Sequence, residues 1–460
     1  MKLLYRRCAG LDIHKDSISV CIRMRVSGKA EAEVLESRFS TFTQELERLA
    51  AFLKEHKVRQ VAMESTGVYW RPVWNILEHA KYGLRLMLVN PARVRALHGH
   101  KTDRIDARRI AEFLQYGLLQ GSFIPSKPVR QMRDLTRMRV HIQHDRNRVI
   151  NRIGGLLETV NIKLGSVASN IVGKSGRAIL DLLAAGSTDA ERMADKAIGQ
   201  LRNKLPELIL ALDGRTDDHF RWMLSRLLEK LDGLDAELAG LDRKTEAEME
   251  PHQELIGRLC TIPGIEKTTA RVLISELGTD MTQFPDSAHA ASWAGLCPGN
   301  SESAGKRFSG KTRKGDRYLR RILVQSAWAA ARTKDCFFNA LFYRVAQKRG
   351  MKKAAVAVAH RLLAVAYILI RDGGVYYERG GDYFDRRNPE RTAKKLSKRL
   401  EKIGFQVVLT RRPLTPVPPS EVVAAEVCSK CHKWRLGQCI HDEPRPKRTN
   451  KPRMPKETTT

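Results

Sequence analysis

Four acidic side chains in the first quarter of the chain are placed where they could share divalent cations. Asp12 and Glu64 each end an apolar run that reads as a short strand. Asp103 and Asp106 stand three residues apart at the start of a stretch with helical periodicity, which would turn both toward one face. Clustered carboxylates repel one another unless a cation offsets their charge, and hard oxygen ligands suit Mg²⁺ or Mn²⁺. Two such ions can hold the attacking and leaving oxygens of a phosphodiester in line, although ordinary helix caps and surface acids give a similar pattern.

A glycine-rich basic segment much later in the chain holds a second group that could do chemistry. Residues 300–321 contain eight Lys or Arg and two Asp or Glu, and Ser303 stands among them. Glycine flexibility and positive charge suit such a loop to wrap a phosphate. Neighbouring cations could also lower the cost of a serine alkoxide, but no neighbouring histidine supplies a base, so these residues alone favour phosphate binding over nucleophilic catalysis. The cations that would neutralise the phosphate backbone are Lys306, Arg307, Lys311, Arg313 and Lys314.

The charge balance points to a polyanionic partner. The chain has 82 Lys plus Arg against 51 Asp plus Glu, a formal net charge of +31, which exceeds what solubility requires. Arg130, Arg133 and Arg137 are spaced for one face of a helix predicted from about 129 to 160. This face could follow a phosphate backbone or could simply be solvated. No run of 18 apolar residues and no signal peptide is present, so we expect a cytoplasmic protein without a membrane partner.

The elements that must position these residues change in character along the chain. Residues 1 to about 120 alternate strand and helix patterns, which predicts an α/β domain with helices near 43–56 and 68–79. From Leu224 to Leu241 leucines recur with spacings of three and four, and the polar Thr245 continues the same frame. This seam predicts a coiled coil that joins two chains, or an amphipathic helix that packs on its own domain. Single cysteines in apolar runs indicate reduced core residues rather than disulfides.

The last seventy residues have a composition of their own. Residues 391–460 hold seventeen Lys or Arg, six Asp or Glu and many prolines, which predicts a largely disordered basic tail. Within it four soft or borderline ligands fall close together, which suggests a small zinc knuckle in which His432 could substitute as a ligand. Reduced cysteines in a flexible tail are the alternative. The candidate zinc ligands are Cys428, Cys431, Cys439 and His441.

Several motifs in order resemble one family. Gly10-Leu11-Asp12-Ile13-His14-Lys15, Met63-Glu64-Ser65-Thr66-Gly67, Lys101-Thr102-Asp103-Arg104-Ile105-Asp106-Ala107, Ile262-Pro263-Gly264, Gly295-Leu296-Cys297-Pro298, Ser303-Ala304-Gly305-Lys306 and Lys314-Gly315-Asp316 look like those of DEDD transposases of the insertion-sequence one-ten family. The resemblance covers roughly residues 8 to 345.

The resemblance implies a fold and a reaction. The fold would be an RNase H-like (RuvC-like) α/β N-terminal domain, a helical coiled-coil connector and a mainly α transposase domain. Asp12, Glu64, Asp103 and Asp106 would be the metal ligands, and Ser303 would form a transient 5′-phosphoserine link to DNA. Family members act on donor and target DNA under the direction of a structured bridge RNA, and dimers assemble into tetramers in which one subunit's serine completes another's acidic site. Ala304-Gly305 replaces the family's glycine pair, and Ser301 lies nearby, so the choice between the two serines stays open.

The expected domains are 1–125 for the RuvC-like domain, 126–255 for the connector, 256–375 for the transposase domain and 376–460 for the tail. Two other functions remain open. One is a RuvC-like junction resolvase or nuclease that uses metal-activated water and needs no serine. The other is a non-catalytic RNA-binding protein whose acids cap helices.

Overall fold

The computed structural model describes residues 3–25, 31–65, 67–91, 94, 107–299, 301–303, 306–410, 426–427 and 434–435. The chain divides into two compact units, residues 1–125 and 126–460, each with its own core. Asp103, Asp106 and the candidate zinc ligands lie outside the described residues, so the metal sites predicted for them are untested.

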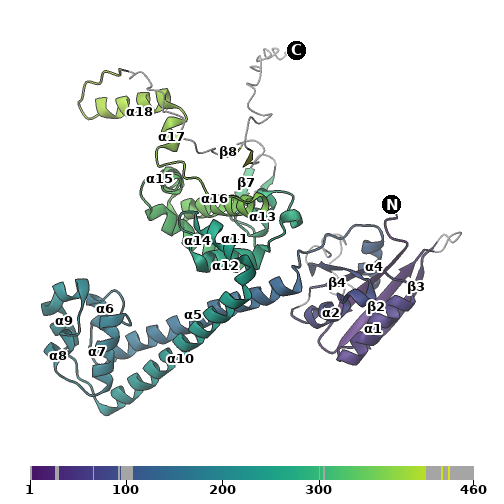
Figure 1. Cartoon of the computed structure of the whole chain (residues 1–460), viewed down its shortest axis with the longest axis horizontal. Coiled ribbons are helices and arrows are strands. Elements are labelled where there is room, and N and C mark those ends of the chain that lie inside the picture. The colour runs from purple at the N-terminus through teal and green to yellow at the C-terminus, as the bar shows by residue number, and fades with distance from the viewer. Residues whose placement is uncertain are drawn as a thin grey trace, which may run out of the picture. The chain divides into compact units, whose positions relative to one another are not determined.

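A mixed five-stranded sheet forms the centre of the first unit (Figure 1). Its strand order is β3-β2-β1-β4-β5, in which β2 is antiparallel to both β3 and β1, and β4 is parallel to both β1 and β5. The strands are β1 (Arg7–Ile13), β2 (Ser17–Met24), β3 (Glu33–Ser40), β4 (Gln60–Glu64) and β5 (Arg85–Val89). Three antiparallel strands followed by two parallel ones make an RNase H-like sheet, as the sequence predicts.

Helices cover both faces of this sheet, because its inner strands are apolar on both sides. Alternate residues of β1, among them Leu11 and Ile13, join a core with α1 (Thr43–Glu55) and α2 (Trp70–Leu77). The residues between them face α4 (Ala107–Gln115), where Cys8 packs with Ile110 and Leu114. At the carboxyl ends of β1 and β4, the side chains that point away from the α1–α2 core therefore lie on the α4 face.

Two long antiparallel helices begin the second unit. They are α5 (Lys127–Thr159) and α10 (Asp218–Glu248), and Figure 1 shows them side by side, with α6 to α9 at one end. Arg139 of α5 pairs with Asp242 of α10, and Arg146 pairs with Asp235. The second pair is seven residues later on α5 and seven residues earlier on α10, which fixes the antiparallel register. The intervening elements are α6 (Leu164–Val167), α7 (Lys174–Ala184), α8 (Ala190–Ala194), α9 (Leu205–Leu212) and a 3-10 helix, Gly199–Lys204.

The leucine seam is used within this helix pair. Leu224 and Leu231 are buried in a cluster that also contains Val149 and Ile153 of α5. Leu238 is also buried, and Thr245 keeps the same frame with an exposed fraction of 2%. Of the two alternatives for this segment, the structure has the seam packed on its own chain.

The rest of the second unit is a helical body around α16 (Met351–Asp372). Among the described helices, this one alone is long and apolar enough to span a membrane by length and composition, but 61% of its most apolar stretch is buried inside the unit. It packs against α11, α13, α14 and α15, so its composition reflects its central place in the core. The other helices are α11 (Gln253–Cys260), α12 (Lys267–Leu277), α13 (Ser287–Trp293), α14 (Arg317–Arg332), α15 (Phe337–Arg349), α17 (Tyr383–Arg386) and α18 (Pro389–Glu401).

Candidate functional site

Asp12 and Glu64 lie side by side at the carboxyl ends of two neighbouring parallel strands. Leu11 of β1 is in register with Met63 of β4, so the next residue of each strand is the acid. Adjacent strands are about 4.8 Å apart, which brings the two carboxylates within reach of one cation. Glu64 is 8% exposed and the Asp12 side chain 21% exposed. His14 contributes a ring nitrogen 3.2 Å from Asp12 Oδ2.

A glycine lets α4 pack directly on β1 beside these acids. A Cβ added to Gly10 would lie 2.2 Å from the carbonyl oxygen of Ala107 and 2.4 Å from the amide nitrogen of Ala111. Ala107 begins α4 and is the residue that follows Asp106 in the sequence. The first turn of α4 is thus fixed against β1 two residues before Asp12. Among the residues that the structure describes, which exclude Asp103 and Asp106, no three potential metal ligands cluster.

A row of polar residues continues from the acids across the same face of the sheet. Asp12 is in register with Ser19 of β2, and Ser19 with Arg38 of β3. Arg38 is exposed and donates from Nη2 to Ser17 Oγ at 3.0 Å. Ser19, Arg38 and Ala107 also line a surface hollow beside this row. Sequence reasoning missed Arg38, because the edge strand that carries it lacks a clear apolar pattern.

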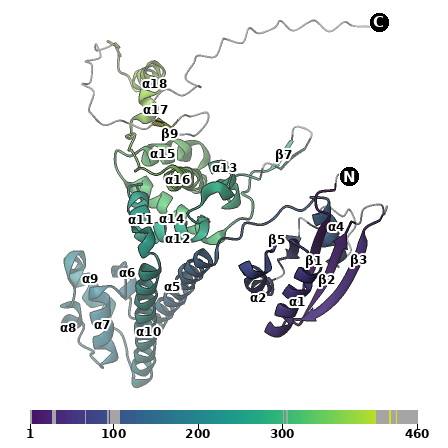
Figure 2. The same cartoon turned by 45° about the vertical axis from the view of Figure 1, so that its right-hand side comes forward.

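In the second unit, Ser303 ends the first strand of a β-hairpin. The hairpin pairs β6 (Ser301–Ser303) with β7 (Lys306–Ser309), and Ser303 is in register with Lys306 across a two-residue connection. Ser301 is in register with Ser309, two residues further from the tip. Over residues 301–303 and 306–309 the description is of the backbone alone. A bridge between Pro298 and Thr312 extends the pairing into an arm, which Figure 2 shows projecting from the helical body.

The base of this arm is anchored by close backbone packing and by a buried acid. A Cβ on Gly315 would lie 2.3 Å from the amide nitrogen of Gly295, so these two glycines let the arm's ends meet. Asp316 then caps α14, accepting from the backbone N–H groups of Tyr318 at 2.9 Å and Leu319 at 2.8 Å. Arg137 of α5 donates to the same carboxylate at 2.9 Å. The end of the arm that leads into α14 is therefore held in a fixed position.

Two of the three α5 arginines predicted to bind phosphate instead form ion pairs inside the protein. Arg137 donates to both carboxylate oxygens of Glu276, at 2.7 and 2.8 Å, and Arg133 pairs with Glu276 at 2.9 Å. The Glu276 side chain is fully buried, and burial raises its pKa while it lowers the pKa of Arg133. We therefore correct the assignment of Arg133 and Arg137: they compensate a buried carboxylate. For Arg130 the predicted role is untested.

Of the predicted cations on the arm, Lys311, Arg313 and Lys314 are exposed, which leaves them accessible to a phosphate backbone. The side chains of Lys306 and Arg307 lie outside the described part of the arm. The core cysteines Cys8, Cys21 and Cys336 are buried, Cys260 and Cys297 are partly buried, and none of these five forms a disulfide.

Family and relatives agree over both units. Residues 9–162 match a DEDD transposase family of IS110 type, described as "Transposase", and residues 257–341 match the family "Transposase IS116/IS110/IS902 family". The transposase for insertion sequence element IS1111A of Coxiella burnetii is 24% identical over 78% of this chain and 88% of its own length.

Other relatives match over shorter stretches. The insertion element IS110 uncharacterized 43.6 kDa protein of Streptomyces coelicolor is 29% identical over 41% of this chain and 46% of its own. A pilin gene-inverting protein of Moraxella bovis is 32% identical over 26% of this chain and 38% of its own. The solved structure of Thermus thermophilus RuvC aligns with 25% of this chain and 99% of its own, at 17% identity and a TM-score of 0.21.

Two family matches follow one another in the expected order: one covers the sheet that carries Asp12 and Glu64, and the other covers the arm that carries Ser303. The chain belongs to the IS110 family of DEDD transposases and is an enzyme of DNA transposition.

Proposed function

We propose that this transposase cuts and rejoins DNA through a transient 5′-phosphoserine link formed by Ser303 and directed by a bridge RNA. The observation that carries the proposal is the register of the arm. Ser303 is the last strand residue before the tip, and the exposed side chains of Lys311, Arg313 and Lys314 follow the returning strand. A nucleophile next to a projecting tip can reach a DNA backbone, whereas Ser301 stands two residues further from the tip on the same strand.

The acidic face would supply the metal site. Asp12 and Glu64 offer only oxygen donors from adjacent strand ends, the chemistry that Mg²⁺ or Mn²⁺ prefers. Asp106 is one peptide bond from Ala107, which Gly10 holds against β1, and this supports assigning Asp103 and Asp106 to the same site. Bound divalent cations would polarise the scissile phosphodiester and offset the charge that develops on it.

The proposed bond changes balance without a co-reactant. Ser303 Oγ attacks phosphorus and forms the new ester bond, while the bond from phosphorus to the deoxyribose 3′-oxygen breaks. The proton lost by Ser303 is matched by one gained by the 3′-oxygen. The serine ester conserves the energy of the phosphodiester, so a 3′-hydroxyl can attack it and rejoin the strand without ATP. Exposed Arg313 and Lys314 would neutralise the flanking backbone.

Partners and assembly belong to the same proposal. Donor and target DNA would be the substrates, base pairing to the guide RNA would choose their sequences, and the reaction would take place in the cytoplasm. Dimers that assemble into tetramers would bring the serine of one subunit to the acids of another. The name of the Moraxella bovis relative implies inversion of a gene, a reaction that needs rejoining as well as cutting, and this favours a recombinase over a water-using nuclease.

A pair of matched serine variants tests the nucleophile. Ser303→Ala should abolish both the covalent protein–DNA adduct, trapped by denaturation during the reaction, and the joining of strands. Ser301→Ala, on the same strand, should retain both. Adduct formation by Ser303→Ala but not by Ser301→Ala would move the role to Ser301. Cleavage by both without any adduct would establish a water-using nuclease.

A second pair of experiments tests the acids and the guide. Asp12→Asn should remove metal-dependent cleavage while leaving DNA binding intact, because only the metal ligand changes. Normal recombination by this variant would leave the acids as structural caps. Sequencing of RNA that co-purifies with the chain should recover one structured species, and its absence would remove guided targeting.

A further inference from the structure

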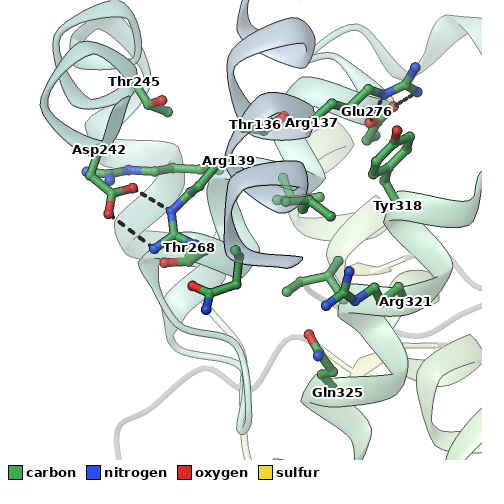
Figure 3. Close-up of a pocket in the computed structure, with 15 residues that line it drawn as sticks. Thr136, Arg137, Arg139, Asp242, Thr245, Thr268, Glu276, Tyr318, Arg321 and Gln325 are labelled. Carbon is green, nitrogen blue, oxygen red and sulfur yellow. Dashed lines mark hydrogen bonds and ion pairs between the residues drawn. The ribbon is translucent and has the colours of Figure 1, made fainter. Parts of the chain in front are cut away.

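A cavity of about 130 Å³ lies between the connector helices and the transposase body, where α5 and α10 meet α12 and α14 (Figure 3). One water needs about 10–15 Å³ of such space, so the cavity could hold many waters or one ring system. It has no part in the active site described above. Its walls do, however, include α14, the helix that begins where the serine arm ends.

Two buried polar atoms on this cavity have no hydrogen-bond partner within the described part of the chain: Thr245 Oγ1 and Arg271 Nε. Thr245 is 2% exposed. The Arg271 side chain is 12% exposed and uses Nη2 for a pair with Glu246 at 3.0 Å. Burying an unpaired polar group costs free energy, so such atoms are rare in native proteins. A hydroxyl and a guanidinium N–H without partners on one cavity indicate a missing acceptor.

Thr245 is also the point at which the leucine seam breaks. The frame that buries Leu231 and Leu238 would bury a leucine here equally well. A threonine at this position gives up apolar burial and leaves its hydroxyl unpaired. The break in the seam is therefore explained if the hydroxyl serves something that enters the cavity.

The charges around the cavity favour an anion. Arg139 is bidentate to Asp242, at 2.6 and 3.1 Å, and Arg137 is bidentate to Glu276, so these two pairs are internally balanced (Figure 3). Arg271 and Arg321 also line the cavity; Arg271 pairs through Nη2 with Glu246, which is outside the lining, and the lining contains no further acid. Arg321 contacts the ring of His144. Burial and the Arg321 charge lower the pKa of that histidine, and an imidazole carries no negative charge that could balance Arg321.

The uncharged part of the lining suits a flat heterocycle. Val272 and Ile322 give apolar walls, Tyr318 gives an aromatic ring, and Thr268 and Gln325 give polar groups near the opening. Apolar walls with a few convergent polar groups are typical of sites for small ligands and unstacked bases. Arg271 and Arg321 would then meet the attached phosphate.

We propose that this cavity holds one unpaired nucleotide of the nucleic acid bound by the transposase, with its base between α12 and α14 and its phosphate on Arg271 and Arg321. This inference rests on the proposed function, because it requires that the protein binds DNA or a guide RNA. Occupancy would couple the connector to the helix that carries the serine arm, since α5, α10 and α14 all contribute to the site. The nucleotide could come from the DNA or from the guide RNA, which share this chemistry.

The test is the binding of single-stranded DNA and RNA oligonucleotides, each carrying 2-aminopurine, to the full-length protein. Thr245→Val removes the hydroxyl but keeps the shape of the side chain. It should weaken binding about three- to tenfold and reduce 2-aminopurine quenching, without lowering the thermal midpoint, because an unpaired buried hydroxyl stabilises nothing. The matched control is Thr216→Val, which removes another unpaired hydroxyl of this unit away from the cavity and should bind as the wild type does.

A second variant keeps the proposal falsifiable if Thr245→Val fails to fold. Gln325 is exposed at the opening, so Gln325→Leu should fold normally and still weaken binding. If the variants weaken binding of the DNA probe alone, the nucleotide comes from DNA; if they weaken binding of the RNA probe alone, it comes from RNA. Wild-type affinity and quenching with both probes, in every folded cavity variant, would overturn the proposal. All proteins in this assay carry Ser303→Ala and no divalent cation is added, so failure of the proposed chemistry does not affect the result.

Discussion

Replacing Gly10 with alanine tests whether the contact between β1 and α4 positions the acidic site. The added Cβ would lie 2.2 Å from the carbonyl oxygen of Ala107. Real Cβ atoms essentially never come within 3.0 Å of another heavy atom, so α4 must withdraw by at least 0.8 Å, the difference between those distances. The obstacles are backbone atoms, which cannot rotate away as the end of a side chain could. The shift therefore falls on the start of α4, next to Asp106 in the sequence.

The size of the effect follows from this displacement. Overpacking of a core contact costs about 1–3 kcal/mol of unfolding free energy, a large share of the roughly 5–15 kcal/mol that stabilises a domain. A misplacement of about 1 Å near reacting groups costs on the order of 10²-fold in rate. We expect Gly10→Ala to lower Mg²⁺-dependent DNA cleavage about 100-fold and to destabilise the first unit by about 1–3 kcal/mol.

Urea unfolding followed by circular dichroism measures the stability, and plasmid cleavage measures the rate. Gly155→Ala is the matched control, because this glycine lies within α5 and an added Cβ would meet nothing within 4 Å. Alanine is the better helix former, so the control should gain about 0.5–1 kcal/mol. Gly10→Ala with wild-type stability and wild-type cleavage would refute the role assigned to this contact.

Three further predictions concern the second unit and the buried thiol of Cys8. Glu276→Gln should destabilise by roughly 3–5 kcal/mol in urea unfolding, because two arginines lose their buried counter-charge; Asp242→Asn, at a side chain 40% exposed, should cost under about 1 kcal/mol. Leu231→Ala should cost roughly 2–5 kcal/mol but leave the sedimentation of the protein unchanged, since this leucine packs on its own chain; a changed oligomer would contradict that packing. Burial raises the pKa of Cys8 to about 12, so iodoacetamide at pH 8 should modify it only after unfolding, and peptide mass spectrometry that finds it labelled in the native protein would be inconsistent with its burial.

The placement of Asp12 and Glu64 could be predicted because local pattern and topology agree. Each acid ends an apolar run, and the apolar run specifies a buried strand. The carboxyl ends of parallel strands meet at one edge of a sheet, which is where the structure has both residues. No such pattern marks β3, since its side chains are mostly exposed and polar. Arg38 therefore could not be connected with Asp12 from the sequence, although one strand alone separates them in the sheet.

The α5 arginines show what local spacing leaves out. Arg133 and Arg137 have the spacing of a helix face in a strongly basic protein, and that pattern predicted a phosphate-binding surface. Their acidic partners, Glu276 and Asp316, are 139 or more residues away in the sequence. Neither acid lies in a sequence pattern that predicts a buried ion pair. A fully buried carboxylate needs compensation wherever the fold places it. The formal charge of the chain therefore overstates the cations that are free for nucleic acid. Because Arg313 and Lys314 remain exposed, the arm that carries Ser303 keeps positive charge for nucleic acid after the pairing of Arg133 and Arg137 is taken into account.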